Sequence, residues 1–178
     1  MTSTVPRPDL SLMAHPHHYA ATLTWTGAAQ GPARDYHGYS RDYSVEIPGK
    51  PVLRGSADAA FRGDPGLYNP EDLLLVALSA CQMLSYLALG ARLGVEVHAY
   101  RDRATGTMGI QRQPGQKIAR LRFVEVVLHP EVTISADSDA ARALALHEQA
   151  QGECFIANSV NFPVRHEPTI LKAGNKAA

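Results

Sequence analysis

The stretch NPEDLLLVALSACQM, residues 69–83, decides the fold because it carries the start of the longest predicted element. Asn69 is a favoured helix N-cap, and Pro70 suits the first helical position, where a missing N–H group has no cost. The two acidic residues that follow match the positive end of the helix dipole. The stretch then runs apolar for three turns, and Gly94 is a typical residue just past a helix end. The pattern predicts a helix from Asn69 to about Leu93.

One stripe of this helix recurs at three- and four-residue spacing. Its members are Leu74, Leu78, Cys81, Ser85 and Ala88. Further leucines lie on the other faces, so we expect the helix to be buried nearly all round. Ser85 follows Cys81 by one turn, and its hydroxyl is expected to bond either the sulfur or a carbonyl of its own helix.

The rest of the chain alternates between strand-like runs and one further helix. Strands are predicted over residues 19–26, 41–47, 95–103, 105–111, 118–134 and 162–170. A second helix begins at Asp137 or Ser138, runs to about Gln151 before Gly152, and carries Ala141, Leu144, Ala145 and Glu148 on one stripe. The segment 154–160 suggests a short third helix. Short connections between strands favour antiparallel pairing, so the predicted class is α+β, with helices on one face of an antiparallel sheet.

Length and composition indicate one soluble domain. The chain has 178 residues, of which 45 % are hydrophobic and 19 % charged, with 17 basic and 17 acidic side chains. We predict a single domain over residues 18–172, a disordered extension over 1–17 and a flexible tail over 173–178, with Met13 as an alternative start to Met1. There is no basic block for nucleic acid or a membrane surface, no signal peptide and no apolar run of the ~18 residues that span a bilayer. These features predict a cytoplasmic protein.

The chain has only two cysteines, Cys81 and Cys154, which lie 73 positions apart. In the cytoplasm such cysteines are reduced, catalytic or inert rather than structural disulfides. No CxxC motif is present, and a zinc site would need two of eight scattered histidines, so no metal is predicted. The tract HPHH at residues 15–18 is interpreted as solvated, and His98 and His147 as surface or hydrogen-bonded residues. On spacing alone, inert cysteines are the favoured interpretation.

A reactive interpretation needs a thiolate. Cys81 lies too far along its helix for the dipole to help, so it would need a cation from elsewhere in the fold. Cys154 follows Gly152 and Glu153 and is expected to open a new helix, where free N–H groups favour a thiolate. If the two thiols meet, they form a peroxide-reducing pair in which one becomes a sulfenic acid and the other condenses with it.

The stretch NPEDLLLVALSACQM, followed about 70 residues later by GECFIANSV, resembles the OsmC/Ohr family. This is the group of osmotically inducible and organic hydroperoxide resistance proteins, and the likeness covers roughly residues 18–171. The segments GPARDY, PGKP, FRGDP and CFIANSVNFPV resemble an OsmC-like branch. The resemblance implies an OsmC-like fold with long central helices, an intertwined homodimer, and no cofactor.

The resemblance also implies a thiol peroxidase that reduces organic hydroperoxides, or hydrogen peroxide. Cys81 matches the peroxidatic cysteine and Cys154 the resolving one, with re-reduction by a dithiol such as dihydrolipoamide. Glu71 matches the glutamate that holds an arginine against the thiolate. Arg34, in GPARDY, is our choice for that arginine. The alternatives are Arg41, Arg54 and Arg62.

Two other functions fit parts of the sequence. A non-catalytic binding or scaffold dimer on the same fold would leave both cysteines inert, because a fold does not fix a function. A cysteine hydrolase or acyltransferase would need a histidine base beside Cys81. No histidine lies within residues 69–83, so this alternative ranks last.

Overall fold

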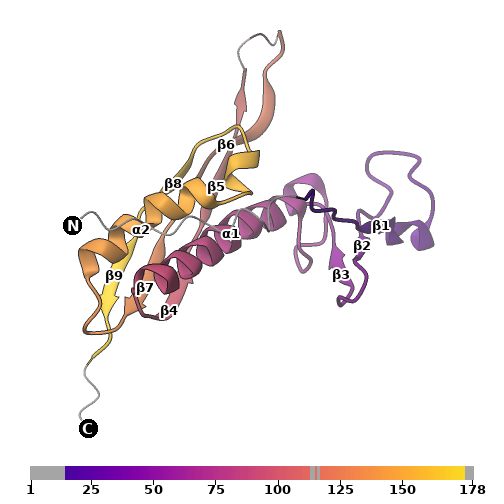
Figure 1. Ribbon diagram of the computed structural model, residues 1–178. Coiled ribbons are helices and arrows are strands. Elements are labelled where there is room, and N and C mark those ends of the chain that lie inside the picture. The colour runs from indigo at the N-terminus through magenta and orange to yellow at the C-terminus, as the bar shows by residue number, and fades with distance from the viewer. Residues whose placement is uncertain (1–14, 113–114, 116, 175–178) are drawn as a thin grey trace. The chain divides into compact units, whose positions relative to one another are not determined.

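The computed structural model describes residues 15–112, 115 and 117–174, and it confirms the α+β class (Figure 1). Most of the predicted N-terminal extension and C-terminal tail lies outside these residues. The chain divides into two compact units, with the boundary after Leu74, inside helix α1 (Pro70–Leu93). The single domain predicted over residues 18–172 therefore comprises two units, called here the N-terminal and the C-terminal unit.

The N-terminal unit contains a three-stranded antiparallel sheet. Its strands are β1 (Thr22–Trp25), β2 (Tyr43–Glu46) and β3 (Leu53–Gly55), in that order. Short 3-10 helices follow β1, over Thr26–Gln30, and β3, over Ala59–Phe61. The sequence did not predict β3, because three residues after a proline-rich turn give too short a pattern to recognise.

The C-terminal unit holds two three-stranded sheets. One has the order β4–β7–β9, from Val97–Asp102, Pro130–Ile134 and Thr169–Lys172. The other has the order β5–β6–β8, from Thr105–Gln111, Arg120–Leu128 and Val164–His166. The predicted strand 118–134 breaks at His129 into β6 and β7, and the predicted last strand gives β8 and β9, so each run supplies both sheets. β8 and β9 pair in parallel with β6 and β7, which corrects the purely antiparallel prediction, because helix α2 carries the chain back across the sheets.

Helix α1 begins and ends as its sequence predicts. The Asn69 side-chain oxygen accepts a hydrogen bond from the Asp72 amide at 2.7 Å, and the Asp72 carboxylate accepts one from the Asn69 amide at 3.3 Å. This reciprocal pair satisfies two amides that the first helical turn leaves without partners. At the other end, Gly94 has a φ of 73°, a left-handed conformation that favours glycine.

Helix α2 (Ala140–Glu153) begins and ends later than predicted. Its N-cap is Asp139, whose carboxylate accepts hydrogen bonds from the amides of Ala141 and Arg142. The helix continues through Gly152 rather than stopping before it. The predicted stripe was wrong, because Leu144 is 49 % exposed, and the buried residues are Ala143, Leu146, His147 and Ala150.

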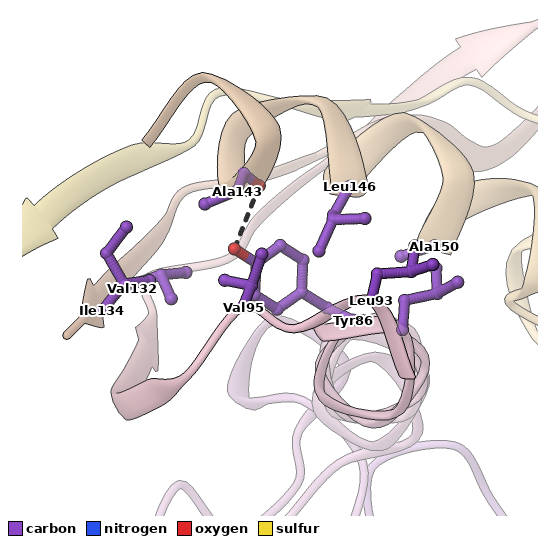
Figure 2. Close-up of a cluster of buried hydrophobic side chains, with 9 residues drawn as sticks. Tyr86, Leu93, Val95, Val132, Ile134, Ala143, Leu146 and Ala150 are labelled. Atoms are coloured by element: carbon purple, nitrogen blue, oxygen red, sulfur yellow. Dashed lines mark hydrogen bonds between the residues drawn. The ribbon is translucent and has the colours of Figure 1, made fainter. Parts of the chain in front are cut away.

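The core of the C-terminal unit lies between α1, α2 and the β4–β7–β9 sheet. Figure 2 shows side chains from these elements gathered around the ring of Tyr86. The cluster comprises Tyr86, Leu89, Leu93, Val95, Val132, Ile134, Ala143, Leu146 and Ala150. The buried Tyr86 hydroxyl donates to the Ala143 carbonyl at 3.0 Å, so this polar atom enters the core with its hydrogen bond satisfied (Figure 2).

Helix α1 is less buried than predicted. Val76 is 60 % and Leu84 62 % exposed, and only 28 % of its most apolar 18-residue window is buried. Among the described residues, α1 is the one helix long and apolar enough to cross a membrane by length and composition. This corrects the expectation that no segment qualifies, because Ser, Gly and Gln interrupt the run without adding charge. Core helices of soluble proteins pass the same test.

The sequence predicted that His147 is either exposed or hydrogen-bonded, and its side chain is neither. Its ring stacks on Tyr86 with centroids 4.2 Å apart, and neither ring nitrogen has a hydrogen-bond partner. Burial, followed by the charge of His166, lowers the pKa of His147 to about 4. His98, in contrast, is exposed as predicted and lies 2.9 Å from the Glu96 carboxylate.

We predict that this histidine makes the fold sensitive to acid. Because the pKa of His147 in the folded chain lies below its ordinary value of 6.5, the unfolded chain binds the proton more readily. The stabilisation is complete above pH 6.5 and is lost as the pH falls toward 4, by up to about 3 kcal/mol. Urea unfolding at pH 7.0, 5.5 and 4.5 measures the loss.

A His147→Phe variant preserves the stacked ring and removes the proton site, so its stability should fall less over the same range. His98→Ala is the matched control, because it removes an exposed histidine, and its profile should follow that of the parent. A His147→Phe profile that parallels the parent would contradict the prediction.

Candidate functional site

The fold brings the two cysteines together. Cys81 lies in the middle of α1 and is half-buried, whereas Cys154 caps the end of α2 and is fully buried. The two thiols interact, and the interaction with Cys81 contributes to the raised pKa of Cys154.

Cys154 occupies the opposite kind of helix end from the one predicted. It follows the last residue of α2, where carbonyl groups and the negative end of the dipole disfavour a thiolate. Burial is the largest cause of its raised pKa, ahead of the contact with Cys81. The backbone amide of Ala157, which opens the next 3-10 helix, donates to the sulfur at 3.4 Å and opposes the shift only in part.

Two side chains of α1 hold α2 beside the cysteine pair. Gln82 is fully buried and donates to the His147 carbonyl at 3.1 Å. The Ser85 hydroxyl donates to the Glu153 carbonyl at 3.5 Å, the residue just before Cys154. Ser85 therefore reaches across to α2, whereas the sequence suggested a bond to sulfur or to its own helix.

Glu71 lies in the first turn of α1 and lines a separate cavity within the N-terminal unit. The cavity measures about 410 Å³ and is mainly apolar, with walls from Leu23, Trp25, Tyr39, Tyr43 and Phe61 and polar groups from Arg41, Ser56, Asp58 and Glu71. The Glu71 Oε2 atom is buried and has no hydrogen-bond partner. Burial, followed by the charge of Glu71, raises the pKa of Tyr43. A buried, unpaired carboxylate oxygen favours a cationic partner.

Arg41 is the candidate arginine that shares this cavity with Glu71. Its guanidinium donates to the carbonyls of Tyr39 and Tyr36, and it lies 3.9 Å from the centroid of the Tyr39 ring. The other three candidates are exposed and do not line the cavity: Arg34, Arg54 and Arg62. The sequence held a signal for Arg41, because Tyr39, Arg41 and Tyr43 alternate as residues on one face of an extended segment do.

The described residues hold no cluster of side chains that could bind a metal ion. Within residues 15–112, 115 and 117–174, no three His, Cys, Asp or Glu side chains converge to bind an ion. The chemical groups that the fold does assemble are two thiols in the C-terminal unit, and a carboxylate and a guanidinium in the N-terminal unit.

Comparison with protein families gives one clear match. The family model described as OsmC-like protein matches residues 63–169, more than half of the chain. This range contains both cysteines and Glu71 and excludes Arg34 and Arg41. No curated protein matches the chain.

Solved structures of similar fold cover most of the chain. An OsmC-like protein of unknown function from Vibrio cholerae is 29 % identical, with a TM-score of 0.77 over 86 % of this chain and 100 % of that one. Organic hydroperoxide resistance proteins from Legionella pneumophila and Elizabethkingia anophelis are 17 % and 18 % identical, with TM-scores of 0.61 and 0.62. The match to the Legionella protein covers 87 % of this chain and 97 % of that one. The match to the Elizabethkingia protein covers 90 % of this chain and 100 % of that one. At these identities the last two show the fold alone.

Proposed function

We propose, from the premise that this chain belongs to the OsmC-like protein family, that it is a thiol peroxidase that reduces organic hydroperoxides. Cys81 attacks the peroxide, its sulfur takes the distal oxygen as a sulfenic acid, and an alcohol leaves. The Cys154 thiol then condenses with the sulfenic acid, which forms a disulfide and releases water. A dithiol in a reducing, cytoplasmic environment restores both thiols.

The observation that carries this proposal is the interaction between the two thiols. The chain has only two cysteines, and the fold places both at one point between α1 and α2. The different burial of the two supports different roles. Cys81 is half-buried and open to a substrate, whereas Cys154 is fully buried and held as the thiol. Two proteins of the same fold are organic hydroperoxide resistance proteins, so organic peroxides are the first substrates to test.

We predict that the purified protein consumes cumene hydroperoxide when dihydrolipoamide is supplied. Cys81→Ser should reduce the rate to the uncatalysed background, because a hydroxyl is not the nucleophile that this reaction requires. Cys154→Ser should still consume about one equivalent of peroxide and then stop at a sulfenic acid, which a dimedone adduct detects by mass spectrometry.

A parent protein that shows no turnover, or a Cys81→Ser variant as active as the parent, would refute the peroxidase. With intact folding in both, the first result would favour a non-catalytic scaffold with inert cysteines. Mass spectrometry of the parent after one equivalent of peroxide should show the loss of two hydrogens and a peptide that joins residues 81 and 154.

We further propose Arg41, in place of Arg34, as the arginine that Glu71 holds for the reaction. Its support is the shared cavity, in which Glu71 has an unpaired buried oxygen and Arg41 already lines the wall. The guanidinium now donates to two backbone carbonyls, and these bonds can exchange for the carboxylate because a guanidinium–carboxylate pair joins two ionised groups and can be bidentate.

We expect Arg41→Ala to lower the rate constant for peroxide reduction by roughly one to two orders of magnitude, as loss of a charge-assisted interaction does. Glu71→Gln should lower the rate less, because it removes the orienting charge and keeps the shape. Arg34→Ala is the matched control, an exposed arginine outside the cavity, and it should react at the parent rate. A slow Arg34→Ala variant beside a normal Arg41→Ala variant would reverse the assignment.

We also propose that a second copy of the chain covers the exposed face of α1, which gives a homodimer. Val76, Ala80 and Met83 line a mainly apolar groove of about 400 Å³ with residues of β4, and Leu84 beside them is 62 % exposed. Exposed apolar surface on this scale marks an interaction site in a soluble protein.

Light scattering should give a mass near twice the 19.2 kDa of one chain. Leu84→Glu should shift the mass toward the monomer, because a buried unpaired charge opposes association. Leu144→Glu on α2 introduces the same charge at another exposed leucine and should leave the dimer intact. A monomeric parent, or equal dissociation by both variants, would contradict the proposal.

A further inference from the structure

The stripe of α1 that carries Cys81 also contacts Glu153, the last residue of α2. Cys81, Ser85, Ala88 and Arg92 follow one another at spacings of four, three and four residues, so they share one face of the helix. Cys81 contacts Cys154, and both Ser85 and Arg92 contact Glu153. The same face therefore touches two consecutive residues at the end of α2.

Glu153 is held at two points. Its carbonyl accepts the Ser85 hydroxyl at 3.5 Å, and its carboxylate accepts the Arg92 guanidinium at 2.8 Å. The guanidinium is itself tied back to α1, because its Nε atom donates to the Ala88 carbonyl at 3.3 Å. Because the Arg92 guanidinium donates to both Ala88 and Glu153, the pair has a defined geometry in addition to its charge attraction.

The sequence position of Glu153 argues against a role in helix stability. A carboxylate in the last turn of a helix opposes the dipole, so α2 gains nothing from an acid at this position. The ion pair is also partly exposed, with side-chain exposures of 31 % and 37 %, and pairs of this kind add little to overall stability. The pair does fix the position of Glu153, the last residue of α2, which directly precedes Cys154.

We propose that Glu153, held by Arg92 and Ser85, is a positioning residue that keeps the Cys154 thiol against Cys81 for the resolving step. The inference rests on the proposed peroxidase for its purpose, but the disulfide it concerns can be measured without peroxide. In that step the Cys154 sulfur attacks the sulfenic sulfur of Cys81, the S–O bond breaks, and the oxygen leaves as water with the proton of the thiol.

The charge of Arg92 has a second effect on this step. The attacking form of Cys154 is its thiolate, and a free carboxylate on the preceding residue would oppose that negative charge. Arg92 pairs with the Glu153 carboxylate, one residue before Cys154 in the chain. Its removal therefore loosens the end of α2 and also makes the thiolate harder to form.

The test is the effective molarity of the Cys81–Cys154 disulfide in glutathione redox buffers, read by acid quench and mass spectrometry. We expect Arg92→Ala and Glu153→Ala each to lower it roughly threefold to tenfold, with unchanged urea midpoints. Arg92→Lys should recover part of the loss. The double variant Arg92→Glu with Glu153→Arg should recover it as well, because the pair is restored in reverse.

Arg165→Ala is the matched control. It removes another exposed ion pair of the C-terminal unit, with Glu125 at 2.6 Å, and it should leave the effective molarity at the parent value. A parent value in Arg92→Ala and Glu153→Ala, or an equal fall in Arg165→Ala, would overturn the inference. A parent that forms no 81–154 disulfide would overturn it too. A parent that forms the disulfide but consumes no peroxide refutes the peroxidase and leaves the positioning role standing.

Discussion

The packing of α1 against α2 is the interaction on which the C-terminal unit depends. Two buried side chains of α1, Tyr86 and Gln82, donate to carbonyls of α2 at 3.0 and 3.1 Å. Each bond satisfies a polar atom that would otherwise enter the core at a cost, so the helices have little freedom to slide. This fixed register brings Cys81 and Cys154 to the same point, although they lie 73 positions apart.

The elements with strong local signals were predictable from the sequence. Helix α1 was predictable because an N-cap, an early proline and a closing glycine mark its ends. The buried face of α2 was not predictable. Leu144 and Leu146 lie two positions apart on different faces, and only tertiary packing decides that Leu146 is the buried one. The breaks at His129 and before Pro168 were hidden inside continuous strand-like runs, and pairing of distant strands decides them.

The candidate site was predictable for its cysteines and less so for its environment. The resemblance singled out Cys81, Cys154 and Glu71 by motif, and the fold brings the two cysteines together. The motif does not fix the arginine, and the prediction of Arg34 stays untested. Of the four candidates, Arg41 lines the cavity with Glu71. Cross-helix contacts of Ser85 and Arg92 could not be predicted, because they depend on the angle at which α2 crosses α1.

Burial separates the two thiols more sharply than sequence position does, and it supports the different roles proposed for them. Burial and the interaction with Cys81 raise the pKa of Cys154, and a protonated thiol is a poor nucleophile toward peroxide. In the proposed peroxidase, oxidation of Cys81 removes the neighbouring thiol, which is one cause of the raised pKa of Cys154. Under that proposal, reaction at Cys81 favours the next reaction at Cys154.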